Sequence, residues 1–186
     1  MKLKKINAGL GLLSILFMLL HIGYSAFAYM TMYYNPAMKS VFAIPFIVFA
    51  CLHAVFGMAT VFSQKDGTRL DLYPKKNART ILQRVSAALI FPLLILHLYT
   101  FTLMKASAES GMTVFIILLM IAELLFFGVV ITHVAVSFSN AFITLGLLSS
   151  PKAQKAIDTV MYIFGAAAFL VSAFAVIRGQ VVMFLS

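Results

Sequence analysis

Charged side chains and cysteine are both scarce in this sequence, and each scarcity excludes a class of protein. Only 10% of the 186 residues are charged, and 63% are hydrophobic. Soluble chains carry roughly a quarter charged residues, so a soluble globular domain is excluded. The single cysteine, Cys51, has no partner for an intramolecular disulfide and excludes a cysteine-based zinc or iron–sulfur site. The sequence also lacks internal repeats and low-complexity tracts.

Long apolar blocks dominate the chain instead. A membrane-spanning helix needs about 20 apolar residues, and we find such blocks at about 7–30, 41–63, 82–104, 112–143 and 157–185. Several are hydrophobic around their whole circumference, unlike the helices of a soluble amphipathic bundle. The sequence therefore predicts an all-α fold: a single domain over residues 1–186, built as a polytopic membrane bundle of five transmembrane helices.

The net charge of +9 is distributed unevenly between the two sides of such a bundle. Only Lys39, Lys105 and Arg178 fall on one side. The other side holds Lys2, Lys4, Lys5, Lys65, Arg69, Lys75, Lys76, Arg79, Arg84, Lys152 and Lys155. This positive-inside pattern predicts a cytoplasmic N-terminus and an external C-terminus in the cell's inner membrane. It explains the basic charge through lipid and topology, so we expect no nucleic-acid partner.

The N-terminal segment has a second interpretation. A basic KLKK start, an apolar run and the small-residue pattern Ala26-Phe27-Ala28 together resemble a secretory signal with its cleavage site. However, the run carries one of the chain's four histidines. We therefore expect it to be retained as the first transmembrane span.

Four histidines lie inside the first four apolar blocks, one in each: His21, His53, His97 and His133. Ionisable residues within membrane spans are costly and usually functional. A single histidine could bond to a neighbouring helix or relay protons. Four on successive helices favour a different role, because two facing imidazoles ligate one haem iron and four hold two haems within a helical bundle. Bis-histidine ligation fills both axial positions, which predicts electron transfer across the bilayer.

Depth along the helices suggests how the histidines pair. Measured from the outer helix ends, His21 lies roughly 18 Å deep and His97 roughly 12 Å. His53 lies roughly 21 Å deep and His133 roughly 33 Å. The ordering gives an outer pair, His21 with His97, and an inner pair, His53 with His133. Counting from the inner ends separates the pairs less cleanly, so spacing favours this pairing without requiring it.

Residues beside the inner pair suit a flat porphyrin. Small side chains at Gly57, Ala54, Ala135 and Ser137 would leave room for the macrocycle. Arg84 sits at the cytoplasmic start of the third helix, where a haem propionate would attract a cation. An ordinary positive-inside anchor is an equally good interpretation of Arg84.

These features together resemble a known family, the dihaem cytochrome b membrane anchors of succinate:quinone oxidoreductases. The matching stretches are LLHIGYSAF, LHAVFGMATVF, LQRVSAALIFPLLILHLYTF and the run from His133 through Ser150-Pro151-Lys152-Ala153-Gln154. They cover nearly the whole chain, up to the start of the fifth helix. The chain is most similar to the single-anchor, five-helix type found in Gram-positive succinate dehydrogenases and shared by related fumarate reductases.

The resemblance implies two haem b groups and specific partners. It assigns His53 and His133 to a proximal haem near the cytoplasm, and His21 and His97 to a distal haem near the outer face. It implies a flavoprotein subunit and an iron–sulfur subunit docked on the inner loops, the longest being residues 63–80. Electrons would pass between these subunits and a membrane quinone, expected to be menaquinone, linking the chain to the succinate step of the tricarboxylic acid cycle. The chain itself would carry no dehydrogenase active site.

The resemblance is incomplete at two positions. Ala87 stands where many relatives carry glycine after the Ser or Thr of the third helix. Ile131 occupies the place where some fumarate reductase anchors have a glutamate proposed for proton return. A proton route through that position is therefore unsupported.

Glu123 is an acidic residue deep inside a predicted span. It lies roughly 15 Å outward of His133 along the fourth helix, level with the distal haem. One hypothesis is proton exchange at a distal quinone site, which Tyr24, Tyr29 and Tyr99 could line. The alternative is a hydrogen-bonded structural carboxyl, with the tyrosines acting as interfacial anchors.

Two other functions compete with a succinate:quinone oxidoreductase anchor. One is the dihaem cytochrome b anchor of a different respiratory complex, such as a hydrogenase or formate dehydrogenase. The other is a small proton-coupled transporter that uses histidines as proton relays. Transporters often contain repeated halves with broken helices, and the sequence has no such halves, which disfavours this second alternative.

Overall fold

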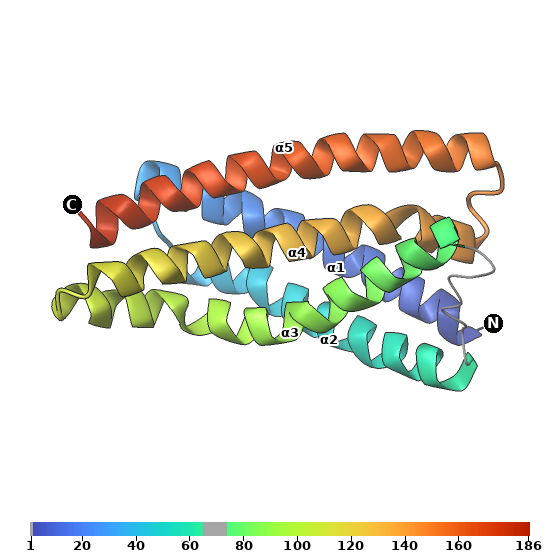
Figure 1. Ribbon diagram of the computed structural model, residues 1–186, viewed down its shortest axis with the longest axis horizontal. Coiled ribbons are helices and arrows are strands. Elements are labelled where there is room, and N and C mark those ends of the chain that lie inside the picture. The colour runs from blue at the N-terminus through green and yellow to red at the C-terminus, as the bar shows by residue number, and fades with distance from the viewer. Residues whose placement is uncertain (1, 65–73) are drawn as a thin grey trace.

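The computed structural model describes residues 2–64 and 74–186, with side chains left undescribed at 63, 64 and 74–77. The described chain forms α1 (Lys2–Thr31), α2 (Pro36–Gln64), α3 (Pro74–Glu109), α4 (Thr113–Leu145) and α5 (Pro151–Phe184). Each helix runs along the long axis of the molecule, and the N- and C-termini lie at opposite ends (Figure 1). All five are long and apolar enough to cross a membrane. The prediction of an all-α, five-span membrane bundle is confirmed.

The helices extend beyond the predicted apolar blocks at several ends. α2 begins at Pro36 instead of about 41, α3 at Pro74 instead of about 82, and α5 at Pro151 instead of about 157. Proline suits the first helical turn because its missing N–H has no partner there anyway. The Asn35 side chain also accepts a hydrogen bond from the Ala37 N–H at 2.9 Å, which caps α2. Helix starts are thus set by proline and caps, whereas hydropathy marks only the part inside lipid.

The polar stretch at residues 63–80 is shorter as a loop than predicted. Its last part belongs to α3, because the helix begins at Pro74. Residues 65–73, where partner docking was expected, lie outside the described part of the chain. The docking prediction is therefore neither supported nor contradicted by the fold.

The two described connections on either side of α4 are tight turns. The outer turn passes through Gly111, whose φ of 67° is accessible to glycine at little cost. At the other end of α4, Gly146 has φ 82°, and its N–H bonds to the Ile143 carbonyl. Leu147 N–H bonds to the Phe142 carbonyl at 2.9 Å, which completes a Schellman-type C-cap. Residues 152–155 lie in the first turn of α5.

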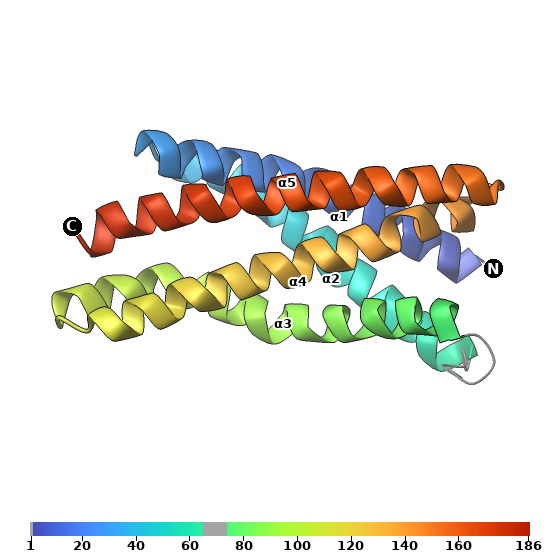
Figure 2. The same ribbon diagram turned by 45° about the horizontal axis from the view of Figure 1, so that its top comes forward.

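The helices pack as two antiparallel hairpins joined through α4 and α5. α1 packs along α2, and α3 packs along α4. α4 lies between α3 and α5, and α1 contacts both α4 and α5 (Figure 2). Within the described chain, α2 packs closely along α1 but makes no extensive backbone approach to α3 or α4. Side chains reaching inward from both hairpins therefore meet across this wider space.

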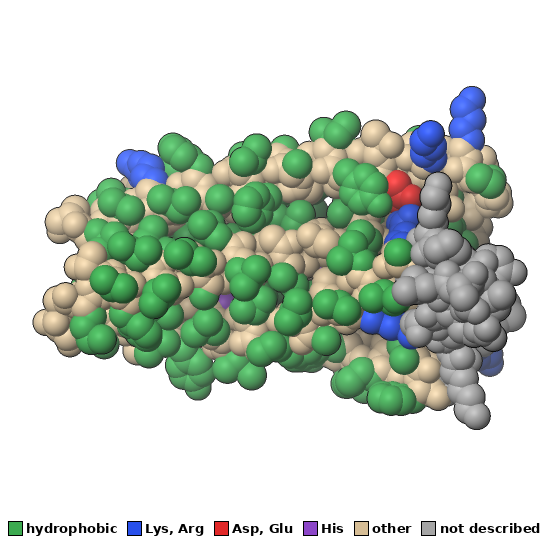
Figure 3. Space-filling view, viewed as in Figure 1, with side chains coloured by type: hydrophobic (Ala, Val, Ile, Leu, Met, Phe, Trp, Pro, Cys, Tyr) green, Lys and Arg blue, Asp and Glu red, His purple; other side chains and the backbone are tan. Residues whose placement is uncertain are grey.

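The distribution of side chains is that of a membrane protein. Large apolar residues are exposed along the helices, whereas Glu123, Ser139 and Gln180 are among the buried polar residues. Figure 3 shows apolar side chains over the length of one face, with most Lys and Arg gathered at the end beside the grey residues. We call this the basic end, and the opposite end, with Lys39, Lys105 and Arg178, the far end. The protein is a multi-pass membrane protein.

Candidate functional site

The inner histidines meet across the space between the two hairpins. His53 projects from α2 and His133 from α4. Their ring centroids are 6.3 Å apart, with the planes inclined by 67°. The residues are separated by 80 positions in sequence but lie side by side because α2 and α4 both face the interior. This is the pairing that the depth count favoured.

Each inner imidazole is anchored through its Nδ1 atom. His53 Nδ1 lies 2.9 Å from the Asn7 main-chain carbonyl oxygen. His133 Nδ1 lies 3.0 Å from the Gln83 carbonyl oxygen and 3.1 Å from the Ser86 hydroxyl oxygen. A carbonyl oxygen can only accept, so the proton resides on Nδ1 and the Nε2 lone pair is free in both rings. Histidines that ligate metals are commonly oriented by this kind of hydrogen bond.

The inner pair fits two-sided ligation of an iron. With each ligating nitrogen about 2.0 Å from a metal, imidazoles on opposite sides have ring centroids about 6 Å apart. The observed 6.3 Å agrees with this spacing. Among the described residues there is no cluster of three or more His, Cys, Asp or Glu side chains that could hold a metal ion by themselves. Two axial imidazoles suit a metal whose remaining ligands come from a macrocycle.

Two residues of α1, Asn7 and Gly11, support His53 and were not predicted from the sequence. A Cβ added at Gly11 would lie 3.0 Å from both Cε1 and Nδ1 of His53, so the imidazole packs directly on the helix backbone there. Asn7 and Gly11 are four residues apart and therefore share a face of α1. Gly57, expected to make room for a porphyrin, instead faces Asn7, with a Cβ there 3.6 Å from Asn7 Oδ1. The i, i+4 spacing of Asn7 and Gly11 was the signal available in the sequence.

The outer histidines lie in an aromatic environment. His21 stacks on Phe46 with ring centroids 6.2 Å apart, and His97 stacks on Phe126 at 5.0 Å. Phe126 belongs to a buried apolar cluster against which Phe46 also packs. Unlike the inner pair, His21 and His97 are not in ring-to-ring contact.

The outer histidines also differ in how their Nδ1 atoms are satisfied. His97 Nδ1 lies 3.0 and 2.9 Å from the two carboxyl oxygens of Glu123. The Glu123 side chain is only 5% exposed. His21 Nδ1 is buried and has no hydrogen-bond partner among the described residues, which is unusual for a buried polar atom. The structure thus places Glu123 against an expected haem ligand.

The tyrosines proposed for a quinone site occupy separate places. The Tyr24 hydroxyl donates to the Asn35 carbonyl at 2.9 Å and accepts from the Asn35 N–H at 2.6 Å, which ties down the turn between α1 and α2. Tyr99 is 61% exposed on the surface of α3. The Tyr29 side chain packs onto Gly179 of α5. A Cβ built at Gly179 would lie within 2.9 Å of three atoms of the Tyr29 side chain. Of the three, Tyr29 is near enough to Glu123 for an electrostatic interaction, whereas the hydrogen bonds described for Glu123 go to His97.

Of the arginines in the described chain, Arg79 has the most extensive interactions that the structure describes. Its guanidinium forms a two-point ion pair with Asp158, at 2.7 and 2.9 Å. It also donates to the Val136 carbonyl at 2.7 Å and to the Ser139 hydroxyl at 2.9 Å. This Arg79 clamp joins α3, α4 and α5 at the basic end. Arg84 is half-buried and follows Gln83, whose carbonyl holds His133.

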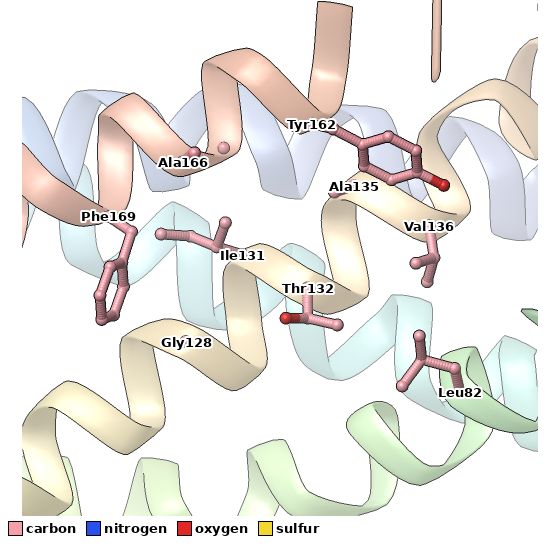
Figure 4. A pocket seen from close by; sticks show the side chains of 10 residues that line it. Leu82, Gly128, Ile131, Thr132, Ala135, Val136, Tyr162, Ala166 and Phe169 are labelled. Carbon is pink, nitrogen blue, oxygen red and sulfur yellow. The ribbon is translucent and has the colours of Figure 1, made fainter. Parts of the chain in front are cut away.

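One cavity lies apart from the histidines. It has a volume of about 550 Å³ and is lined mainly by apolar and small side chains of α4 and α5 (Figure 4). The hydroxyls of Thr132 and Tyr162 are the polar groups on its wall. None of the four histidines lines it, so this cavity is not part of the site that they form.

Comparison of the chain with protein-family models, with curated proteins and with solved structures gave no match.

Proposed function

We propose that the chain is the membrane anchor and electron-transfer subunit of a succinate:quinone oxidoreductase, carrying two bis-histidine b haems. The observation that supports this best is the inner pair. Two histidines from different helices face each other, both have Nδ1 bonded to main-chain oxygen, and both leave Nε2 available. Proton relays have no need for two imidazoles oriented by carbonyls in this way, whereas axial ligation of one iron does.

The chain's own residues would position and insulate the two cofactors. His53 and His133 would hold the inner haem, with Asn7 and Gln83 orienting their rings. His21 and His97 would hold the outer haem, and Arg84 would neutralise a propionate of the inner one. When bound, haem would supply one-electron transfer between these residues. The apolar helices keep water away from this path.

The partners proposed for this subunit follow from its basic end. A flavoprotein and an iron–sulfur subunit would dock at the basic end on the cytoplasmic side of the inner membrane. A membrane quinone, with menaquinone as our choice, would react near the far end. The complex would serve succinate oxidation or fumarate reduction. Anchors of hydrogenases or formate dehydrogenases share the same haem chemistry and form the second candidate.

A spectrum of the purified full-length chain tests the proposal. After expression with ample haem supply, we expect a reduced-minus-oxidised b-type α band and about two haems per chain by pyridine haemochrome. Copurification of a flavoprotein with succinate or fumarate activity would separate the leading candidate from a hydrogenase or formate dehydrogenase anchor. A colourless protein would exclude both and leave the proton-coupled transporter.

Enlarging Gly11 is expected to expel the inner haem. In Gly11→Leu the new side chain overlaps the His53 imidazole, because even a Cβ lies 3.0 Å from it. We expect the occupancy of the inner haem to fall about tenfold or more, as for loss of a residue that orients a metal ligand. Haem content and the α-band spectrum measure this.

Gly9→Leu is the matched control on the same helix, since a Cβ there meets nothing within 4 Å. We expect it to retain both haems. Equal haem loss in the two variants would show that α1 tolerates no enlargement at all and would remove the specific role of Gly11.

A further inference from the structure

Glu123 stands out among the buried polar groups because both of its carboxyl oxygens engage the same imidazole nitrogen. His97 Nδ1 lies 3.0 Å from Oε1 and 2.9 Å from Oε2. Glu123 as a residue is 4% exposed. Within the described chain, the hydrogen bonds of this carboxylate both go to His97. A carboxylate buried this deeply is retained at considerable cost, so a single dedicated partner calls for an explanation.

The four histidines fall into three classes by what their Nδ1 atom meets. His53 and His133 meet neutral main-chain carbonyls, His97 meets a carboxylate, and His21 meets no partner. The ligand sets of the two proposed haems are therefore unequal. The inner set is matched and neutral, whereas the outer set contains one imidazole with an anionic partner.

A carboxylate partner changes an imidazole more than a carbonyl does. It draws the Nδ1 proton more strongly, which raises the electron density and basicity of Nε2. A more basic axial ligand favours ferric over ferrous iron, and hydrogen bonding beyond the ligands is one of the means by which a protein sets haem potential. A fixed negative charge in the low-dielectric interior acts in the same direction.

The same contact fixes the orientation of His97. The two carboxyl oxygens hold the Nδ1 edge of the ring, and Phe126 stacks on its face with planes 28° apart. Glu123 and Phe126 are three residues apart on α4, so one face of that helix supplies both contacts. α4 also carries His133, which places a ligand of the inner haem and the support of an outer ligand on one rigid element.

We propose that Glu123 is a positioning residue for the outer haem, orienting His97 and lowering the midpoint potential of the iron that His97 ligates. This inference rests on the proposed dihaem function. It replaces proton exchange with quinone as the role of Glu123. In the haem-loaded chain, an anionic partner of His97 would stabilise the ferric state of the iron more than a neutral partner would.

Redox titration of the haem-loaded full chain tests the proposal, with Glu123→Gln as the main variant. Glutamine has nearly the same shape and can still accept from Nδ1–H, but it removes the charge. We expect both haems to bind and one midpoint potential to rise by about 59 mV or more. For a one-electron couple, that rise is a tenfold change in the ferric-to-ferrous ratio. The other midpoint should stay unchanged, and one low-spin ferric signal should shift in the electron paramagnetic resonance spectrum.

Two further variants make every result informative. Glu123→Asp keeps the charge, so its potential should stay nearer to wild type than that of Glu123→Gln. Ser172→Ala removes another buried polar group, on α5 and without a hydrogen-bond partner, and should leave both potentials unchanged. If Glu123→Gln loses the outer haem while Glu123→Asp keeps it, the positioning role is supported.

Unchanged potentials and spectra in Glu123→Gln would overturn the proposal. Loss of the outer haem from both Glu123→Gln and Glu123→Asp would also overturn it, because the charge retained in Glu123→Asp would then have no effect. These outcomes are distinguishable from failure of the proposed function. If the proposed function were wrong, the wild-type chain itself would bind no haem, and no midpoint potential could be recorded for any variant.

Discussion

Replacing His53 by alanine is expected to reduce the haem content of the purified chain from about two to about one, and replacing His133 should remove the same haem. Each substitution deletes one axial ligand and leaves the opposite imidazole alone. The two rings contact each other, with centroids 6.3 Å apart, so each substitution removes one of the two imidazoles proposed for the same iron. Haem content, the α-band position and redox titration together identify which haem has gone.

His21→Ala and His97→Ala provide the comparison for the inner pair. Both should remove the other haem and leave the inner one with its original potential. The same haem vanishing after loss of His21 and of His53 would break the pairing. Loss of both haems from every variant would indicate that the cofactors assemble together, and circular dichroism would then show whether the helices had also been lost.

Breaking the Arg79 clamp is expected to destabilise the bundle by about 2–4 kcal/mol, since removing one partner of a buried ion pair leaves the other charge uncompensated. The side chains of Arg79 and Asp158 are only 23% and 15% exposed. In Asp158→Ala the guanidinium keeps its bonds to Val136 and Ser139 but loses its counter-charge. For a chain of this size, the change corresponds to a fall in Tm of roughly 5–15 °C, measurable by thermal denaturation in detergent.

A double substitution separates the charge pair from simple packing. Arg79→Met combined with Asp158→Leu removes both charges, and we expect it to recover much of the lost stability. Lys155→Ala is the control on the same turn region of α5, because Lys155 is exposed, and it should change Tm little. A wild-type Tm in Asp158→Ala would show that the clamp contributes nothing to stability.

Depth counting along the helices was enough to suggest which histidines pair, but not how they are held. His133 and the Gln83 carbonyl are 50 residues apart in sequence, and His53 and the Asn7 carbonyl are 46 apart. Main-chain oxygens have no signature in a sequence. Only the packing of α1 on α2 and of α3 on α4 reveals that these carbonyls orient the two rings.

The role suggested for Glu123 changed for a related reason. Its depth placed it level with the outer histidines, which was compatible with a quinone site or with a structural contact. Depth says nothing of the direction in which a side chain points around the helix. The rotation of α4 relative to α3 brings its carboxyl group to His97. Tyr24 is bonded to Asn35 and Tyr99 is exposed on α3, so neither is described as a partner of Glu123.

The Arg79 clamp was also hidden from sequence reasoning. Apart from the propionate role considered for Arg84, Lys and Arg at the basic end were interpreted as topology signals. No role was predicted for the acidic residue Asp158 on α5. Arg79 and Asp158 are 79 residues apart and meet only because α5 returns alongside α4. An acidic residue among basic ones at the same membrane boundary was the available signal.

Hydropathy along the chain, a property of each local stretch, was sufficient by itself to predict five spanning helices with a histidine on each of the first four. Burial of apolar surface in lipid depends on composition and length, which can be counted residue by residue. Which imidazole nitrogen is free, which carboxylate supports a ligand and which helices are clamped depended on helix rotation and on contacts between distant residues. Those follow from how side chains interlock between helices, and only the tertiary structure decided them.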